Sequence, residues 1–443
     1  MTARRRTRLL VLLGVLAAVL ALVLTALLVP PRGDPPPYLF GTLQTDPARA
    51  RTEHEHGVRV AHMEIHWDRF EPEDGVYDSG YIEQVREELR VFHAAGAKVE
   101  VSLGLHHPPA WLFEQYPSAV LTDQHGGRTV EVPNIVFSES VRDEAARYVS
   151  RVMEETGPEE FWAVRVGVSE TGEFAYPSPA GDPDTGGDPA EEESAYWAYD
   201  ANAQGDESDR PPGVPASPLP GWRPGDRDYR GDPVTTAQVT EWYDWYLGAL
   251  ADAVNWQTLM YRSLGFDGIV KVLVPGSGYF PADHRAAIRA RLDTSVTTRL
   301  MARGAGFFLT VEQVRKDGEV HIVPTSLVDG TGAPRDSGCE PRDAAVDVRA
   351  PDSSVPRTWS SVRWVTAIAV RNGFPVSGES AGPQVEPYRP GVMEQAARQM
   401  RSCGLEGLMW AFDENLYDGT PGSSLQDYAR VIEQSQDEGR RTG

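Results

Sequence analysis

Cysteine is nearly absent from this 443-residue sequence, which contains only Cys339 and Cys403. Neither lies in a Cys-x-x-Cys spacing or near a pair of histidines, so the usual zinc-binding patterns are missing. Two cysteines can form one disulfide in a protein that works outside the cytoplasm, or they can remain as unpaired buried thiols. The sequence leaves both alternatives open.

Positive charge is also scarce, because 42 Lys and Arg stand against 65 Asp and Glu, for a formal net charge of -23. Nucleic-acid binding requires clustered basic side chains, so we exclude nucleic acid as a partner. Neither a Walker phosphate loop nor a His-Glu-x-x-His zinc motif occurs, which removes the usual signals of NTPases and zincins. The apolar content of 40% and the charged content of 24% are those of an ordinary folded protein.

An uninterrupted apolar run from Leu9 to Val29 follows a cluster of arginines near the N-terminus. About twenty residues at about 1.5 Å each span a bilayer core, and the basic flank should stay in the cytoplasm. We therefore expect a cytoplasmic tail at 1–8, a transmembrane signal anchor at 9–29 and a proline-rich spacer at 30–37, with the rest outside the cytoplasm. Secretion after cleavage of a signal peptide is the alternative.

From Tyr38 onward, short β-type runs alternate with longer amphipathic stretches, the pattern of a parallel α/β fold. The expected strands lie at residues 39–44, 58–65, 97–105, 161–168, 265–274, 304–311, 374–378 and 404–412. Eight strands with helical connections are what a closed (β/α)8 TIM barrel requires. We expect the barrel to occupy residues 38–435, with loop insertions at about 177–235 and 312–357 and a C-terminal tail at 436–443.

Two segments at strand ends are rich in aromatic residues. After the second expected strand the chain reads Ile65-His66-Trp67-Asp68-Arg69-Phe70-Glu71-Pro72-Glu73-Asp74-Gly75-Val76-Tyr77-Asp78. After the third it reads His106-His107-Pro108-Pro109-Ala110-Trp111-Leu112, followed by Tyr116-Pro117. The first resembles the signature W-x-x-[LF]-E-P-x-x-G-x-Y-D, and the second the PPAWL and YP sequences, of the retaining β-galactosidases of glycoside hydrolase family 42. The resemblance covers roughly residues 38 to 130 and implies a glycosidase barrel.

Aromatic side chains at strand ends can stack on a sugar ring, and histidines can bond its hydroxyls. We expect Trp67, Trp111 and Trp410 to provide stacking faces, and His106 and His107 to bind hydroxyls. Ordinary barrel packing is the alternative for each of the five. The spacing of the two histidines does not by itself make a metal site.

Glycosidic cleavage usually needs two carboxyl groups, one that donates a proton and one that acts as nucleophile or base. After the fourth expected strand, Glu170 and Glu173 are both candidates for the acid. The family 42 type generally has Asn-Glu here, and this chain departs from it with Ser169-Glu170. Gly172-Glu173 with Tyr176-Pro177-Ser178 is similar instead to the segment VGxGxxGExxYPSY of the β-amylases, whose glutamate is the catalytic acid. We therefore favour Glu173 over Glu170 and expect Tyr176 to bind substrate.

The second carboxylate is expected at Glu379, which ends the short run Phe374-Pro375-Val376-Ser377-Gly378 at the seventh-strand position. The resemblance implies a retaining, exo-acting glycoside hydrolase that acts on a carbohydrate and uses no metal or organic cofactor. Two alternatives remain: an inverting hydrolase of the β-amylase type, and a membrane-anchored barrel that binds carbohydrate without catalysis. The sugar, the linkage and the oligomeric state are not indicated by the sequence.

Overall fold

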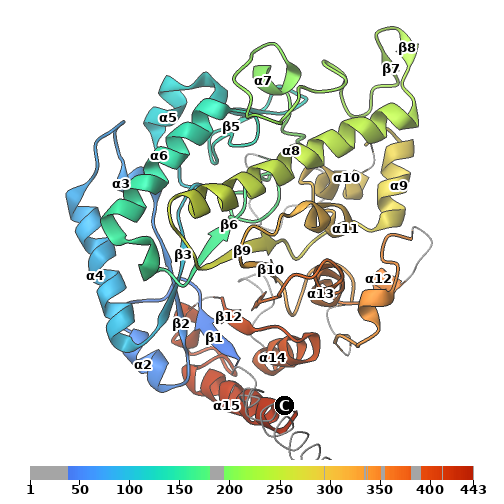
Figure 1. Ribbon diagram of the computed structural model, residues 1–443. Helices are drawn as coiled ribbons and strands as arrows, with labels where there is room; N and C mark the ends of the chain where they lie inside the picture. The colour runs from blue at the N-terminus through green and yellow to red at the C-terminus, as the bar shows by residue number, and fades with distance from the viewer. Residues whose placement is uncertain are drawn as a thin grey trace, which may run out of the picture. The chain divides into compact units, whose positions relative to one another are not determined.

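Among the described residues, eight parallel strands form the central sheet of a barrel (Figure 1). The computed structural model describes residues 38–179, 194–293, 295–333, 336, 338–350, 355–380, 391–411 and 413–442. The barrel strands are β1 (Leu39–Thr42), β2 (Val60–Glu64), β3 (Lys98–Ser102), β6 (Ala163–Val166), β9 (Ile269–Val274), β10 (Val320–Pro324), β11 (Gly378–Glu379) and β12 (Gly407–Trp410). Neighbouring strands in chain order pair with one another from β1 to β10, β11 pairs with β12, and β12 pairs with β1.

Backbone hydrogen bonds close the barrel between β10 and the segment that leads into β11. The amide of Ile322 donates to the Pro375 carbonyl at 3.0 Å, and the amide of Ser377 donates to the Ile322 carbonyl at 3.2 Å. A closed sheet leaves no edge strand unpaired, so the predicted (β/α)8 fold is confirmed.

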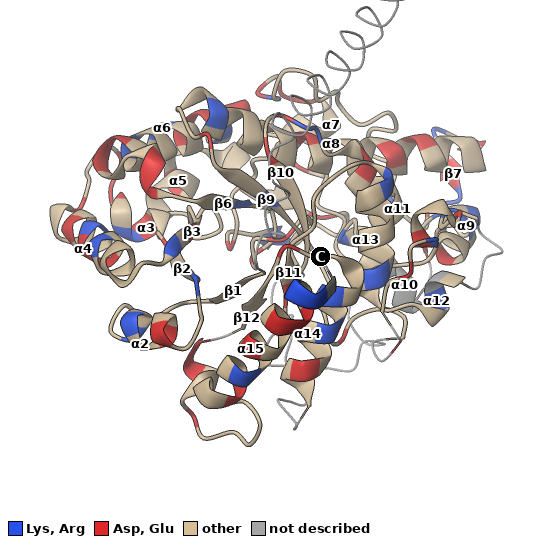
Figure 2. Ribbon diagram, turned by 60° about the horizontal axis from the view of Figure 1, so that its bottom comes forward, with Lys and Arg blue, Asp and Glu red and all other residues tan. Residues whose placement is uncertain are grey.

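Helices follow the strands and surround them (Figure 2). They are α2 (Ala50–Glu55), α3 (Trp67–Phe70), α4 (Ser79–Ala95), α5 (Ala110–Gln115), α6 (Glu139–Thr156), α7 (Ala201–Gln204), α8 (Thr236–Ser263), α9 (Pro281–Arg289), α10 (Ser295–Ala302), α11 (Phe307–Thr310), α12 (Val355–Thr358), α13 (Ser361–Arg371), α14 (Val392–Cys403) and α15 (Leu425–Thr442). Short 3-10 turns lie at Pro117–Ala119, Pro158–Glu160, Val311–Gln313, Asp343–Ala345 and Asp413–Leu416. Two hairpins, β4 (Leu121–Thr122) with β5 (Arg128–Thr129) and β7 (Asp228–Tyr229) with β8 (Asp232–Pro233), lie outside the barrel sheet.

Helix α4 shows how local sequence defines these elements. The Asp78 side chain accepts a hydrogen bond from the Tyr81 amide and caps the N-terminus, while Gly96 ends the helix at a φ of 85°. Between these ends, Ile82, Val85 and other apolar residues at helical spacing are buried. The capping residue and the apolar period are both visible in the sequence.

The sixth strand lies elsewhere than expected. Residues 304–311 contain helix α11, whose Phe307 and Phe308 are buried, and the sixth strand is β10, inside the segment expected to be an insertion. A short apolar run can form either a buried helical turn or a buried strand. The prediction of a strand at residues 304–311 was therefore wrong. The true strand, Val-His-Ile-Val-Pro, is buried along its whole length.

The described part of the expected insertion at 177–235 is anchored by aromatic packing rather than left as a solvated loop. Tyr196 and Trp222 pack edge-on against Trp242 of α8, at ring distances of 5.7 Å and 5.4 Å. The Trp197 indole donates to the Pro177 carbonyl at 2.8 Å. This packing fixes the segment that follows the fourth strand.

Cys339 and Cys403 form a disulfide, which decides between the two alternatives left open by the sequence. It links the segment between β10 and the 3-10 turn Asp343–Ala345 to the last residue of α14. Residues 436–442, which were expected to belong to a C-terminal tail, form the end of helix α15.

The chain divides into two compact units, one of which, Leu39–Glu433, contains the barrel. The other unit contains the expected basic tail at 1–8, the transmembrane segment at 9–29 and the spacer at 30–37, all of which lie outside the described residues. Within the part of the chain that is described, no helix has both the length and the apolar character needed to cross a membrane.

Candidate active site

A cavity of about 540 Å³ lies at the C-terminal ends of the barrel strands. Loops after β1, β3, β6, β9 and β10 contribute to it, together with the last residues of β2 and β11. This is the face where barrel enzymes place their sites. Its polar lining includes Glu64, His106, His107, Arg165, Glu170, Glu173, Arg303, Thr325, Asp329 and Glu379. All three glutamates predicted for catalysis, and both predicted histidines, therefore line one cavity.

The loop after β6 presents Glu170 and Glu173 through a tight network of backbone hydrogen bonds. The amides of Val168 and Ser169 both donate to the Glu173 carbonyl, at 2.8 Å and 3.1 Å. The buried Ser169 hydroxyl accepts from the Glu173 amide at 3.0 Å. A side chain at Gly167 would lie 1.9 Å from the Gly172 carbonyl oxygen, so the loop folds back only because residue 167 is glycine. Ser169, the departure from the family 42 pattern, thus closes this turn.

Glu173 is the more enclosed of the two candidate acids. Its carboxylate accepts hydrogen bonds from the Thr325 hydroxyl at 2.6 Å and from the Thr171 hydroxyl at 3.2 Å. Burial raises the pKa of Glu173, although the Arg303 guanidinium, 3.9 Å away, and the Thr325 hydroxyl oppose the increase. A raised pKa favours the protonated form of the carboxyl group, which is the form that an acid needs.

Glu170 lies beside it with different partners. Its carboxylate accepts from the Ser178 amide at 3.1 Å and lies 3.9 Å from the same Arg303. Arg303 therefore stands between the two glutamates and contacts both at equal distance.

Glu379, at the end of β11, is held by a direct ion pair with Arg165 of β6. Burial raises the pKa of Glu379 to about 7; Arg165 opposes this increase, and the nearby Glu173 carboxylate adds to it. Glu173 and Glu379 are far apart in the sequence but line the same cavity, where the charge of Glu173 disfavours the charged form of Glu379.

Arg165 belongs to a chain of buried charges across the barrel interior. Its Nε atom lies 3.1 Å from Glu100 of β3, and Glu100 also pairs with Lys271 of β9. Burial alone would raise the pKa of Glu100, but Lys271 and Arg165 outweigh burial and hold that pKa below its ordinary value. Four alternating charges thus compensate one another beneath the cavity, with Glu379 at the upper end.

Sequence reasoning missed this charge network, although a signal was present. Each of five neighbouring strands carries a polar residue between apolar neighbours. The strand register places His62 opposite Glu100. It also places both Arg165 and His321 opposite Lys271. A polar residue inside a buried strand needs a partner at the same height in the barrel. Reading the strands together, rather than one at a time, predicts the layer.

The aromatic residues expected to stack on sugar are placed differently, and the structure corrects that expectation. Trp67, Tyr176 and Trp410 are fully buried and Trp111 is 7% exposed, and none of the four is among the described cavity-lining residues. Trp67 stacks on Tyr148, and Tyr176 stacks on Tyr246 of α8. Their faces are covered by protein, so they serve as barrel packing.

Trp67 and Trp111 instead meet at Glu71, the glutamate of the Glu-Pro sequence. The Trp67 indole donates to the Glu71 carboxylate at 3.0 Å, and the Trp111 indole donates to the Glu71 carbonyl at 2.9 Å. The Gly75 amide donates to the same carboxylate at 2.9 Å. The two family-like segments are therefore tied together as one structural corner.

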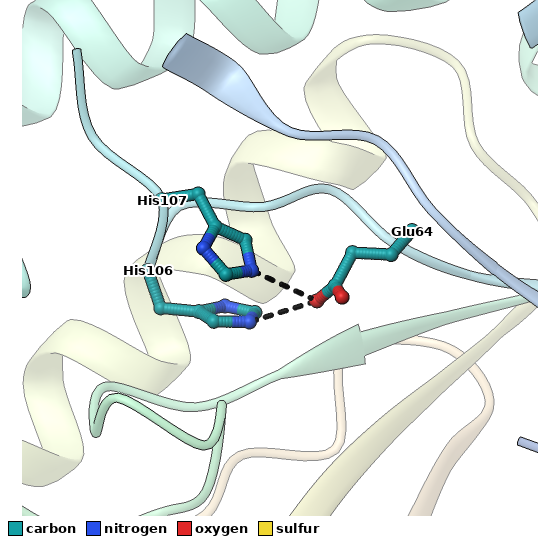
Figure 3. A group of neighbouring side chains, drawn as sticks. All are labelled: Glu64, His106 and His107. Carbon is teal, nitrogen blue, oxygen red and sulfur yellow. Dashed lines mark ion pairs between the residues drawn. The ribbon is translucent and has the colours of Figure 1, made fainter. Parts of the chain in front are cut away.

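Glu64, at the end of β2, was also missed by sequence reasoning. It accepts hydrogen bonds from His106 and His107, and these three side chains point toward one another in the cavity (Figure 3). Burial would raise the pKa of Glu64, but the hydrogen bonds from the surrounding histidines outweigh it and hold the pKa well below its usual range.

Comparison with known proteins connects the chain to glycoside hydrolases. The family model for β-galactosidases of glycoside hydrolase family 42 matches residues 43–160, so the resemblance predicted from the sequence is confirmed over this part of the chain. The β-galactosidase BgaA of Clostridium cellulovorans is 31% identical over 75 residues, which are 17% of this chain and 11% of that protein. The chain thus aligns with only a small part of that relative.

Solved structures show a similar fold over nearly the whole chain. The catalytic domain of the β-amylase from Paenibacillus polymyxa superposes with a TM-score of 0.63 at 15% identity, covering 91% of this chain and all of that one. The β-galactosidase from Bacillus circulans sp. alkalophilus gives a TM-score of 0.51 at 12% identity, covering 92% of this chain and 56% of that one. At such identities the likeness concerns the fold. The family match ends before Glu170, Glu173 and Glu379.

The ion pair with Arg165 generates a prediction about Glu379. A neighbouring cation favours the charged carboxylate, so Arg165→Met should raise the pKa of Glu379 above about 7. Arg165→Lys should raise it less. The measurement is a pH titration of 13C-carboxyl-labelled glutamates by NMR, with the Glu379 signal assigned from Glu379→Gln.

Arg151→Met is the matched control, because Arg151 pairs with Glu155 on the outer helix α6 and should leave the Glu379 titration unchanged. An unchanged or lowered pKa of Glu379 in Arg165→Met would contradict this account of the site.

Proposed function

We propose that the barrel is a glycoside hydrolase that cleaves O-glycosidic bonds, with Glu173 as the acid and Glu379 as the nucleophile. The observation that carries the proposal is that two partly buried carboxyl groups, one in the loop after β6 and one at the end of β11, line one cavity and both have a raised pKa. Glycosidic cleavage requires two carboxyl groups, one of which donates a proton while the other acts in its ionised form. The family 42 match over residues 43–160 supports the same class.

The surroundings assign the two roles. Both carboxyl groups line one cavity, and the charge of Glu173 raises the pKa of Glu379. Arg165 contacts Glu379 directly and favours its charged form, whereas Glu173 has two hydroxyl donors and an arginine only at 3.9 Å. The closer cation therefore assigns the nucleophile's role to Glu379, and Glu173 takes the role of the acid.

In the proposed reaction, the Glu379 carboxylate attacks the anomeric carbon while Glu173 transfers its proton to the departing glycosidic oxygen. Glu173, now ionised, then takes a proton from a water molecule that releases the sugar from Glu379. Retention, exo-action and a β-galactoside substrate are part of this proposal, by analogy with the family that residues 43–160 resemble.

Inversion is the second candidate, favoured by the similarity to a β-amylase catalytic domain along 91% of the chain. In an inverting reaction the base activates water instead of attacking the sugar, and no sugar becomes attached to the enzyme. The anomer first released, observed by proton NMR before mutarotation, separates the two reactions.

A serine hydrolase is disfavoured even though Glu379 lies within Gly378-Glu379-Ser380-Ala381-Gly382, which has the Gly-x-Ser-x-Gly spacing. Such a nucleophile must be exposed above the sheet. Ser380 is 1% exposed, and its hydroxyl accepts a hydrogen bond from the Ala411 amide at 2.9 Å.

Variants of the three glutamates test the roles. Proton donation matters most for a poor leaving group, so Glu173→Gln should lower kcat/KM by about 10² to 10⁴-fold on alkyl glycosides. The same variant should retain much of the first step on a nitrophenyl glycoside, and azide should restore turnover by replacing the activated water. Glu379→Gln should be inactive on both substrates.

Glu170→Gln is the matched control, since Glu170 lies on the same loop and faces the same Arg303. If Glu170→Gln shows the azide-rescued pattern while Glu173→Gln behaves like the wild type, the acid is Glu170. If the full-length wild type cleaves no member of a broad panel of aryl glycosides, the non-catalytic carbohydrate-binding alternative replaces the proposal.

We also propose that the barrel works outside the cytoplasm, tethered by the apolar run at 9–29. Two features support this location: the arginines that precede the run, and the Cys339–Cys403 disulfide, since disulfides persist mainly in oxidising compartments. Fractionated cells should retain the full-length chain with their membranes, and protease added outside intact cells should degrade the barrel. Recovery of a shortened, soluble form from the medium would instead indicate a cleaved signal peptide.

A further inference from the structure

Glu64, His106 and His107 form a cluster that the two-glutamate reaction does not use. Glu64 ends β2, and the two histidines follow β3, the neighbouring strand. We propose that these three side chains bind a divalent transition-metal ion of the Zn²⁺ type at the wall of the cavity. This goes beyond the proposed hydrolysis, which needs no metal.

The backbone brings the two strand ends unusually close. Gly104 has a φ of +57°, and a side chain there would lie 2.1 Å from the Ile65 carbonyl oxygen. Only glycine permits this approach. Beyond it, the Asp68 amide donates to the His107 carbonyl at 3.0 Å, which fixes the histidine loop onto the loop after β2.

The donor atoms already converge on one point. His106 Nε2 lies 2.8 Å from Glu64 Oε1, and His107 Nε2 lies 3.5 Å from the same oxygen (Figure 3). All three donor atoms lie within 4.8 Å of one another. Ligands that bind Zn²⁺ at about 2.0–2.2 Å in a tetrahedral arrangement are about 3.3–3.5 Å apart, so small side-chain rotations would complete the site.

The donor set selects the class of metal. Two imidazole nitrogens with one carboxylate oxygen suit Zn²⁺ and similar borderline cations, whereas Mg²⁺ and Ca²⁺ prefer oxygen ligands alone. Three protein ligands leave a fourth position open, as in catalytic rather than structural zinc sites. All three side chains line the cavity and remain partly exposed, so an ion has a route in and the open position faces the cavity.

Neighbouring groups restrain the ligands from both sides. The His66 ring stacks on His107 with centroids 4.0 Å apart and planes within 2°, and its Nε2 lies 3.7 Å from the second oxygen of Glu64. The loop after β6 passes beside His106, since a Cβ added at Gly172 would make an ordinary van der Waals contact with the His106 ring at 3.5 Å. Such supporting contacts orient ligands and strengthen metal binding.

Metal binding by the full-length protein in detergent tests the proposal without any sugar substrate. The chelator-treated protein is dialysed against low-micromolar Zn²⁺ and its metal content is measured, and binding of Co²⁺ is followed by its visible absorption. We expect one Zn²⁺ per chain, not displaced by excess Mg²⁺. His106→Ala and His107→Ala should each weaken binding by more than about 100-fold, because even supporting contacts are worth 10–100-fold.

His93→Ala is the matched control, since His93 pairs with Glu160 at 3.0 Å on the surface and belongs to no group of three potential ligands among the described residues. Glu379→Gln should bind Zn²⁺ as the wild type does while lacking hydrolysis, which separates failure of this proposal from failure of the proposed reaction. Glu64→Gln, which keeps the side-chain volume, provides a second variant if an alanine variant does not fold. Wild-type protein that takes up less than one Zn²⁺ per chain, or folded histidine variants that bind it equally well, would overturn the metal site and leave the histidines as hydrogen-bond donors.

Discussion

The buried pairing of Arg165 with Glu379 and Glu100 is the interaction on which the rest of the site depends. A charged group in a barrel interior is tolerated only when it is paired, and removing one partner of a buried ion pair costs about 3–5 kcal/mol because the other charge is left uncompensated. Lys271 and Arg165 together balance Glu100 and Glu379. The same pairing fixes the position of Glu379, sets which form of its carboxyl is favoured, and connects the cavity floor to strands β3, β6 and β9.

The segments that resemble family 42 contribute structure more than chemistry. Their tryptophans converge on Glu71, which is fully buried and also lies 3.1 Å from Arg147 of α6. This corner joins the loops after β2 and β3, and those loops carry Glu64, His106 and His107 to the cavity. The family resemblance at Trp67 and Trp111 therefore indicates how the cavity wall is built. The carboxyl groups that we propose for the reaction lie outside the part of the chain that the family model matches.

Much of the fold could be predicted from local sequence, because capping residues, helical periodicity and apolar runs act within a few residues of each other. Seven of the eight strands and the position of Glu379 followed from such signals. The sixth strand did not, because α11 and β10 are adjacent short apolar runs and only tertiary packing decides which one joins the sheet.

The roles of Trp410 and Tyr176 were wrong for a related reason: an aromatic residue near a strand end can face the cavity or the surrounding helices, and the sequence does not specify which. The charge network was missed because its members are far apart in sequence and meet only through the register of neighbouring strands.

The central claim is that Glu379 is the group that reacts with the sugar, and covalent trapping tests it most directly. A 2-deoxy-2-fluoro glycoside with a good leaving group slows the release of a sugar from a retaining enzyme, because fluorine disfavours the oxocarbenium-like transition state. Mass spectrometry of the full-length protein after such treatment should show one added sugar, and peptide mapping should place it on Glu379. Attachment to Glu173 or Glu170, or turnover of aryl glycosides with no sugar attached, would contradict the account.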